Sequence, residues 1–391
     1  PLGEQFTDKG ALQGMKGTTP LTDLSQDFRD RLLGVDPNLG NTFNYAGESY
    51  DAVILTALAS AMAQSNQATV FGPYVNGVTF GGDKCQDFKS CMDIISKGGN
   101  PDYDGVTGPL AFADPGEPAV ASFGTLQFGS DNKLDPDLTE YLIVGDEENA
   151  ATNEGPAAAA FDSGNGKGAL KIGMLLPLTG SLAFLGPPEV AGVTLAVKEI
   201  NAAGGVLGAP VELVSGDSGD TSTNIASQTV ASHQQAGVNA IVGAASSDVT
   251  KTVIDTVTQA GIMMISPANT SDSFTTYNDN GLYFRTAPPD LFQGQVLADL
   301  ITKEGNQSVG ILAQNGEYGT GLAQVIADNL ANAGLGEDVV KQVYYDPNAS
   351  DFSDVVQQMK DLNPDAIVVI GFDESARIIQ VMNEQGIGPA R

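Results

Sequence analysis

Residues 216–219 read GDSG, the kind of sequence that surrounds the nucleophilic serine of trypsin-like hydrolases. That serine needs a histidine and an aspartate beside it, and the continuation GDSGDTSTN does not match this context. The only histidine of the chain, His233, lies in ASHQQAG, a helical pattern in which we expect it to face solvent. The sequence therefore predicts no hydrolase site.

Sites for phosphates, cofactors and metals are not predicted either. GNGKG at 164–168 is too short for a phosphate-binding loop, and it precedes a strand instead of following one. No GxGxxG follows the first strand of the regular part of the chain, so a dinucleotide site lacks its usual turn. Polar turns such as DSGNGKG lack the ligand spacing of a calcium loop. We expect no enzyme, no cofactor and no metal.

Cys85 and Cys91 are the only two cysteines, in GGDKCQDFKSCMD. Their spacing suits a small disulfide-closed loop at the start of a helix, whereas a zinc site needs more ligands nearby. Free thiols are the alternative. We favour the disulfide, and hence an extracytoplasmic protein.

Polar residues follow two strands of the chain. Ser246 and Ser247 come after AIVGA, and Asn269 and Thr270 come after IMMISPA. Ligands of open parallel sheets bind beyond the carboxyl ends of the strands, where hydroxyls and helix N-termini can hold an anion such as a carboxylate. The alternative is that these residues only cap helices, which Ser, Thr and Asn favour.

The elements that position these residues alternate regularly from residue 170 onward. Apolar strands such as LKIGMLLPL and AIVGA are followed by amphipathic helices, which predicts parallel sheets covered on both faces. A break at 270–290 separates two such series, and two series predict two α/β lobes. The first third contributes helices at 21–33, 47–64 and 89–99 and a late pair of strands in AVASFGTLQF and LTEYLIVG.

The composition narrows the class of protein. With 18 basic and 48 acidic residues the net charge is −30, which excludes nucleic acid as a partner and favours a solubilising acidic surface. No apolar run is long enough to cross a bilayer. The first residues, PLGEQFTDKG, do not read as a signal peptide.

Several motifs together resemble a known family. KIGMLLPLTGSLAFLG, EINAAGGVLGAPVELVSGD, AIVGAASS, GIMMISPANTS, YFRTAPPD and YGTGLA occur in this order. They resemble the branched-chain amino-acid receptors of ABC transporters, which are type I periplasmic or lipoprotein solute-binding proteins. YDAVILTALA, the cysteine pair and YDGVTGPLAFADPGE, which come earlier in this chain, resemble the C-terminal portion of that family.

The resemblance implies a circularly permuted α/β chain with the type I periplasmic-binding-protein fold, two doubly wound parallel-sheet lobes and a three-segment hinge. Lobe one is expected to combine 16–117 with 169–286. Lobe two is expected to combine 1–15, 118–145 and 287–391. The acidic segment 146–168 is then a flexible linker, the former N-terminal tether. A strand and turn of about a dozen residues that the family usually carries between the motifs GIGPAR and PLGEQF is missing.

The resemblance also implies roles for residues in the cleft. Ser247 and Thr270 would hold a ligand carboxylate, with backbone groups of Ala245 and Ala268 beside them. Asn269 replaces a smaller residue of the family, and either a contact with a polar ligand group or a cap on the following helix is open to it.

On the remaining sides of the ligand, aromatic and acidic residues are expected. Leu185 occupies a position where the family often has an aromatic residue. Tyr318 would close over the ligand, and Tyr50 would line its side-chain end, with plain core packing as the alternative for both. Asp373 is the candidate partner of a ligand ammonium, with Phe372 stacked above it. The alternative for Asp373 is a favourable position at the start of a helix.

The implied function is reversible capture of an amino acid or similar small carboxylate for an ABC importer. The receptor is expected to be a monomer outside the cytoplasm that delivers its ligand to an ABC permease and reaches the membrane only through a tether. A ligand-sensing regulator with the same fold is the first alternative, and an enzyme that uses the cleft is the second.

Overall fold

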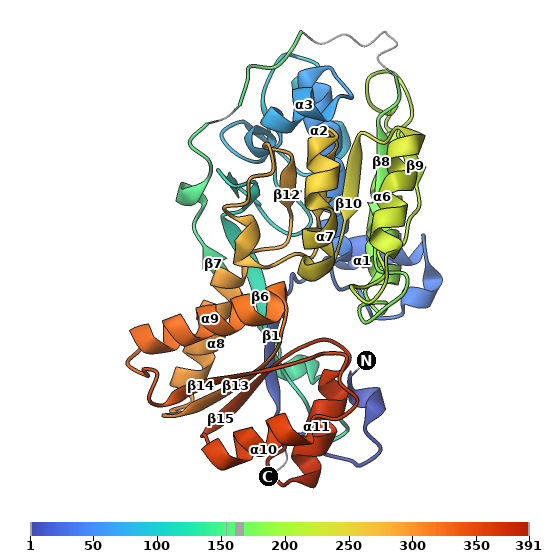
Figure 1. The fold of residues 1–391 in the computed structure, drawn as a ribbon. Helices are drawn as coiled ribbons and strands as arrows, with labels where there is room; N and C mark the ends of the chain where they lie inside the picture. Colours follow the sequence, from blue (N-terminus) through green and yellow to red (C-terminus); the bar gives the residue numbers. More distant parts are fainter. Residues whose placement is uncertain (1, 154, 161–167, 390–391) are drawn as a thin grey trace.

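The computed structural model describes residues 2–153, 155–160 and 168–389. Figure 1 shows two α/β bodies, one above the other, joined by a few extended segments. We call the upper one the large-sheet body, after its five-stranded sheet, and the lower one the small-sheet body, after its three-stranded sheet.

The large sheet is wholly parallel and has the order β12-β11-β10-β8-β9. Its central strands are buried along their whole length, which explains why they read as continuous apolar runs. The sequence prediction missed β12 inside the presumed break, because this strand is only three residues long and follows a turn-rich stretch. The strands are β8 (Lys171–Leu175), β9 (Glu212–Val214), β10 (Ala240–Gly243), β11 (Met263–Ser266) and β12 (Tyr283–Arg285).

Helices from the first third and from the middle of the chain cover this sheet. Helix α2 (Ala46–Ala63) is buried throughout and packs closely against α5 (Gly186–Ala202). The contact is tight at Gly192, where an added Cβ would lie 2.2 Å from the carbonyl oxygen of Ala46. The other long helices here are α1 (Gln26–Leu33), α6 (Ile225–Ala236) and α7 (Ser247–Gln259).

The small-sheet body has the parallel order β14-β13-β15 and contains the last four helices. The beginning of the chain packs on its last helix, because the Gln380 side chain donates to the carbonyl of Gln5 at 3.0 Å. The elements are β13 (Val309–Gln314), β14 (Val340–Tyr345), β15 (Ala366–Ile370), α8 (Asp290–Lys303), α9 (Glu317–Asn332), α10 (Ser353–Leu362) and α11 (Ser375–Glu384).

An antiparallel sheet, β1-β6-β7, lies between the two bodies. It contains the late pair of strands expected from the sequence, β6 (Val120–Gln127) and β7 (Glu140–Gly145), and also β1 (Lys16–Pro20). β1, β6 and the stretch between β12 and α8 run between the bodies. The expected linker 146–168 follows β7, and residues 154 and 161–167 of it lie outside the described residues. Its Ala159 donates a backbone hydrogen bond to Met62 of the large-sheet body.

The region between α2 and β6 is built from short elements. The predicted disulfide is confirmed: Cys85 and Cys91 are bonded, with their Cα atoms 5.3 Å apart, and they close the loop that leads into α4. The side chain of Asp87 caps this helix by accepting from the backbone N–H of Ser90 at 2.8 Å. The elements are α3 (Ala68–Phe71), β2 (Asp83–Cys85), α4 (Phe88–Ile95), β3 (Pro101–Tyr103), β4 (Phe112–Ala113) and β5 (Glu117–Pro118).

The prediction that His233 faces solvent is wrong. Its side chain is buried between α6 and the sheet, and its Nε2 lies 2.8 Å from the carbonyl oxygen of Met174. The close approach is possible because Gly173 and Gly216 leave room for the ring. None of the helices in the described ranges is both long and apolar enough to span a membrane.

Candidate ligand site between the two bodies

The polar residues after β10 and β11 lie together, as their positions at the carboxyl ends of neighbouring parallel strands predict. Ser246 has the capping role that was the alternative: its Oγ accepts from the backbone N–H of Val249 at 3.3 Å. Ser247 is the first residue of α7, and its buried Oγ accepts from the backbone N–H of Ser271 at 3.4 Å. The hydroxyl proton of Ser247 is thus left for another acceptor.

Asn269 does not cap the following helix, which was one of the two roles that the sequence left open. Its side-chain nitrogen donates to the carbonyl of Ala245 at 2.8 Å, and its Oδ1 accepts from the Tyr283 hydroxyl at 2.9 Å. The carboxamide is completely buried and ties the ends of β10, β11 and β12 together.

A buried arginine that the sequence analysis did not single out also anchors the loop 269–275. Arg285 forms an ion pair with Glu117 and donates to the carbonyl of Ser271 at 2.8 Å and to the Thr275 hydroxyl at 2.9 Å. Because both partners of the pair are buried, Thr270 is presented on a rigid loop.

The GDSG sequence supports a turn instead of a catalytic serine. Asp217 accepts from the backbone N–H groups of Leu178, Thr179 and Gly219 and from the Thr179 hydroxyl at 2.6 Å. These hydrogen bonds lower the pKa of Asp217 although partial burial opposes them. The anchored turn leads directly to Leu185.

Apolar residues from both bodies meet in one cluster. Leu182, Leu185 and Ala245 are buried in it, and Ala268, Tyr45 and Phe372 pack against them. Phe372 comes from the small-sheet body, whereas the other members come from the large-sheet body. The cluster therefore brings four of the predicted residues together across the gap between the bodies.

Tyr318 joins this wall through Phe372. The two rings are stacked, with centroids 5.5 Å apart and an angle of 7° between their planes. Burial raises the pKa of the Tyr318 hydroxyl above its ordinary value, and the nearby carboxyls of Asp290 and Glu374 raise it further. The Tyr318 hydroxyl makes no hydrogen bond within the part of the chain that the structure describes.

Asp290, at the start of α8, is an acidic residue of this site that the sequence analysis missed. It is completely buried, and neither carboxyl oxygen accepts a hydrogen bond, although the hydroxyl of Thr270 lies beside it. Burial raises its pKa to about 8 and Asp272 raises it further, whereas the Thr270 hydroxyl and the more distant charge of Arg285 lower it. In the sequence, Asp290 follows APP and looks like an ordinary acid in the first turn of a helix. Only its burial in the structure identifies it as a candidate ligand-binding residue.

Two more buried acids lie near Tyr45, on helices that pack together. Glu189 of α5 is completely buried, and neither of its carboxyl oxygens has a hydrogen-bond partner. Burial raises its pKa well above the ordinary value, as does the neighbouring Glu48 of α2. Burial also raises the pKa of Glu48, to about 8. The pKa of Tyr45 is raised by its own burial and by the charges of Tyr318, Glu48, Glu189 and Asp290, so this ring lies among all three acids.

Two expected site residues lie elsewhere. Tyr50 is packed in the core of the large-sheet body, edge to face with Phe28 at 5.2 Å, and its hydroxyl donates to Glu199 at 2.6 Å. Its position on α2 turns it toward α1 and α5. Asp373 is exposed, and its side chain neither caps α11 nor bonds to any described residue.

Glu374, the residue after Asp373, is the buried acid at the end of β15. Its carboxylate accepts from the Tyr345 hydroxyl at 2.8 Å and from the backbone N–H of Phe372 at 3.1 Å. Glu374 therefore fixes the Phe372 backbone and is already satisfied.

The two bodies also contact each other at the rim of this site. Asp248 of α7 accepts from the backbone N–H of Glu317, the first residue of α9, at 2.7 Å. Glu317 in turn accepts from the Ser273 hydroxyl at 2.9 Å. A carboxylate of one body thus caps a helix of the other.

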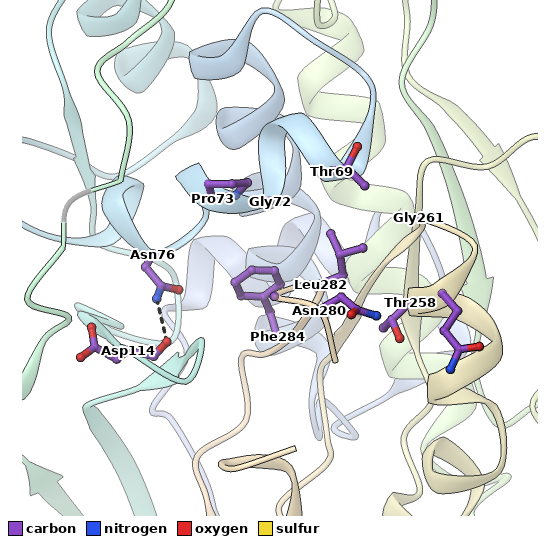
Figure 2. Close-up of a pocket in the computed structure, with 12 residues that line it drawn as sticks. Thr69, Gly72, Pro73, Asn76, Asp114, Thr258, Gly261, Asn280, Leu282 and Phe284 are labelled. Carbon is purple, nitrogen blue, oxygen red and sulfur yellow. Dashed lines mark hydrogen bonds between the residues drawn. The ribbon is translucent and has the colours of Figure 1, made fainter. Parts of the chain in front are cut away.

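Surface hollows add one feature to this picture. A hollow of about 310 Å³ is lined by Tyr45 and Glu48 together with Thr19 and Pro20 of β1. Figure 2 shows a second one, of about 620 Å³, between Thr69, Asn76, Asp114 and Phe284. None of the predicted site residues lines the second hollow, so it adds nothing to the ligand site.

No three His, Cys, Asp or Glu side chains of the described ranges are arranged to hold a metal ion. The candidate site combines three features: an apolar wall with the rings of Tyr45 and Tyr318, hydroxyl groups at the N-terminus of α7, and buried carboxyl groups that form no ion pair with the described residues. This arrangement fits a binding protein with an interbody ligand.

The chain belongs to the periplasmic binding protein family, which residues 169–391 match. This is a family of binding proteins, not of enzymes. Residues 2–153, which come before the matched part, supply α2 and the connecting strands to the same two bodies.

Among curated proteins, the chain is 30% identical over 210 residues to Leu/Ile/Val-binding protein homolog 3 of Brucella melitensis, covering 52% of this chain and 54% of that protein. It is 31% identical over 232 residues to Leu/Ile/Val-binding protein homolog 8 of Brucella abortus, covering 56% of each. The chain thus spans about half the length of these relatives.

Two solved structures agree with the fold. A leucine binding protein of Thermotoga maritima has a TM-score of 0.50 at 25% identity, covering 56% of this chain and 62% of that chain. A type 1 periplasmic binding protein of Bordetella pertussis has a TM-score of 0.50 at 26% identity, covering 56% and 60%. The expected type I α/β fold with parallel sheets is confirmed at this level.

Proposed function

We propose that this protein is the solute receptor of an ABC importer and binds an amino acid reversibly between its two bodies, outside the cytoplasm. Family membership and the names of the relatives, which bind Leu, Ile and Val, support this class. The observation that carries the proposal is Asp290, a completely buried carboxyl group without a hydrogen-bond partner at the edge of an apolar wall.

Asp290 is the proposed partner of the ligand ammonium, in place of the exposed Asp373. A buried carboxylate without a counter-charge is costly, and a ligand ammonium removes that cost. Thr270 lies beside Asp290, and its backbone carbonyl accepts from the Asp290 N–H at 2.7 Å. The α-carbon of an amino acid would therefore lie between Asp290 and Thr270.

The ligand carboxylate is assigned to the hydroxyls of Ser247 and Thr270 and to the N-terminus of α7. Such a helix terminus attracts anions through its free N–H groups and its dipole. Ala245 and Ala268 leave room for the approach. The ligand side chain would lie along Leu185 and Phe372, under the ring of Tyr318.

We extend the proposal to the movement of the two bodies. They act as the lobes expected from the sequence, closing on the ligand with hinge motion in β1, β6 and the stretch 286–289. The contact between Asp248 and Glu317 would then fasten the closed form. The order of segments also supports circular permutation, since α2 from the first third packs on α5, the first helix of the family match.

The experiment is calorimetry of the full chain against the amino acids, with mass spectrometry of the recovered ligand. We expect micromolar or tighter binding of at least one amino acid, released unchanged. In a melting experiment, ligand at a hundredfold excess over the dissociation constant should stabilise the protein by about 2.7 kcal/mol. Binding of sugars or metals alone, or chemical turnover of the ligand, contradicts the proposal.

A further inference from the structure

Glu48 and Glu189 form a second buried acidic group, on α2 and α5, next to Tyr45. The exposed fractions are 7% for Glu48 and 0% for Glu189, and both oxygens of Glu189 lack a hydrogen-bond partner. Asp290 can satisfy only one cation, and its role in the proposed function leaves these two carboxyl groups unexplained. Their helices are locked together at Gly192, so the two acids cannot simply move apart.

None of the described residues forms an ion pair with Glu48 or Glu189, and no cationic side chain contributes to the pKa of either one. Arg285 is paired with Glu117, and Arg31 is paired with Glu199. Arg29 lines the same hollow as Glu48, but its guanidinium is bound to Asp23 at 3.1 Å.

The other titratable groups next to the pair are Asp51, which raises the pKa of Glu48, and Tyr45, whose own pKa is raised by both glutamates. Asp51 is already satisfied by the hydroxyls of Tyr103 and Thr107, at 2.7 and 2.6 Å. Neither Asp51 nor Tyr45 carries a positive charge, so neither can neutralise the pair.

Space for a ligand group exists beside Glu48. The hollow of about 310 Å³ is lined by Tyr45 and Glu48 together with Thr19 and Pro20 of β1 and Tyr141 of β7. A flexible side chain that runs along Leu185 and Phe372 toward Tyr45 would end at this acidic pair.

We propose that the ligand carries a second cationic group, bound by Glu48 and Glu189, so that the receptor prefers basic amino acids with a lysine-like or arginine-like side chain. This inference rests on the proposed function and deepens it. Tyr45 separates the two acidic positions and supplies an aromatic surface for the aliphatic stem and for the cation.

The assignment has a consequence for protons. The pKa of Glu48, raised to about 8, means that this carboxyl group holds a proton near neutral pH in the empty site, and burial raises the pKa of Glu189 as well. A bound cation favours the ionised forms instead. Binding of the second cation at pH 6.5 therefore releases protons from this pair. Two ligands that share the same α-amino and carboxyl groups engage Asp290 equally. The difference in proton release between them therefore reports Glu48 and Glu189.

The test is calorimetry of the full chain with lysine and with norleucine, which has the same aliphatic chain without the terminal ammonium. We expect lysine to bind at least tenfold more tightly and to release more protons, measured as the dependence of the binding enthalpy on buffer ionisation. Glu189→Gln and Glu48→Gln should remove most of this preference and leave norleucine binding within about threefold. Glu212→Gln, an exposed acid on β9, is the matched control and should preserve the preference.

The outcomes separate the two proposals. Norleucine binding as tightly as lysine to the wild-type chain overturns the second cation and keeps the amino-acid receptor. A diamine such as cadaverine binding while no amino acid does overturns the proposed function and retains the cation site. A lysine preference that survives in both glutamine variants, with circular dichroism showing that they are folded, overturns the role of Glu48 and Glu189.

Discussion

Asp290→Asn is expected to change the empty and the liganded protein in opposite directions. Burial raises the pKa of Asp290 from its ordinary 3.8 to about 8. A carboxyl group with a raised folded-state pKa holds its proton more tightly in the folded state. Its contribution to stability is therefore complete below about pH 4 and is lost as the pH rises toward 8.

The magnitude follows from the size of the shift. About four pKa units correspond to a loss of about 5 kcal/mol between pH 4 and pH 8, at 1.36 kcal/mol for each unit. Asparagine has nearly the same shape and no charge, so the variant escapes this loss. We expect Asp290→Asn to match the wild type near pH 4 and to be several kcal/mol more stable at pH 8 without ligand.

Ligand binding should respond with the opposite sign. Removing one partner of a buried charge pair typically costs about 2–5 kcal/mol, which corresponds to at least about a 30-fold loss of amino-acid affinity. Urea unfolding at pH 4.5, 6 and 8 gives the first quantity, and calorimetry gives the second. Glu48 and Glu189 titrate in both proteins, so the difference between the two curves reports Asp290 alone. Identical pH dependence, or unchanged affinity, refutes the reasoning.

Three further changes have expected results. Asp373→Asn should leave amino-acid affinity unchanged in calorimetry, because the Asp373 side chain is exposed and unbonded; a tenfold loss would restore its role as the ammonium partner. Replacing Cys85 and Cys91 by serine should lower the free energy of unfolding by about 2 kcal/mol in urea titrations, the value for a loop this short, whereas no change means that the disulfide adds nothing to the stability. Asp248→Asn should weaken the contact with Glu317 and increase the radius of gyration measured by small-angle scattering, and an unchanged radius argues against Asp248 as the fastening contact.

Most long elements were predictable from the sequence because their apolar periodicity is strong. AIVGA and IMMISPA form the buried strands β10 and β11, and the amphipathic helix α7 follows β10 as predicted. The short strand β12 was not predictable, since three residues carry no periodicity. His233 was misjudged for a related reason: two glycines, Gly173 and Gly216, make room for the ring, and only the packed structure brings them to it.

The site was predictable where it depends on topology. Ser247 and Thr270 lie just after neighbouring strands, so the order of the sheet brings them together. The position of Leu185 was predictable because it comes just after the turn that follows β8. The buried acids were not predictable in this way. Glu48 and Glu189 each stand in the first turn of a helix, where the helix dipole favours an acid on the surface as well. A weak signal was present, since both are followed by nearly continuous apolar sequence.

The same acids explain why binding and closure would be coupled. In the empty protein, Asp290 and Glu48 are each either protonated or a buried charge without an ion-pair partner, so the proposed closed arrangement is unfavourable near and above pH 8. Glu189 acts in the same direction, because burial raises its pKa as well. A cationic ligand reverses this, because it supplies counter-charges to three acids that form no ion pair with any of the described residues. The ligand then stabilises the closed arrangement more than the open one, which is the differential affinity that any ligand-driven movement requires. On this reasoning, the affinity of the receptor and the extent of its closure should fall together as the pH drops below the range in which these carboxyl groups ionise.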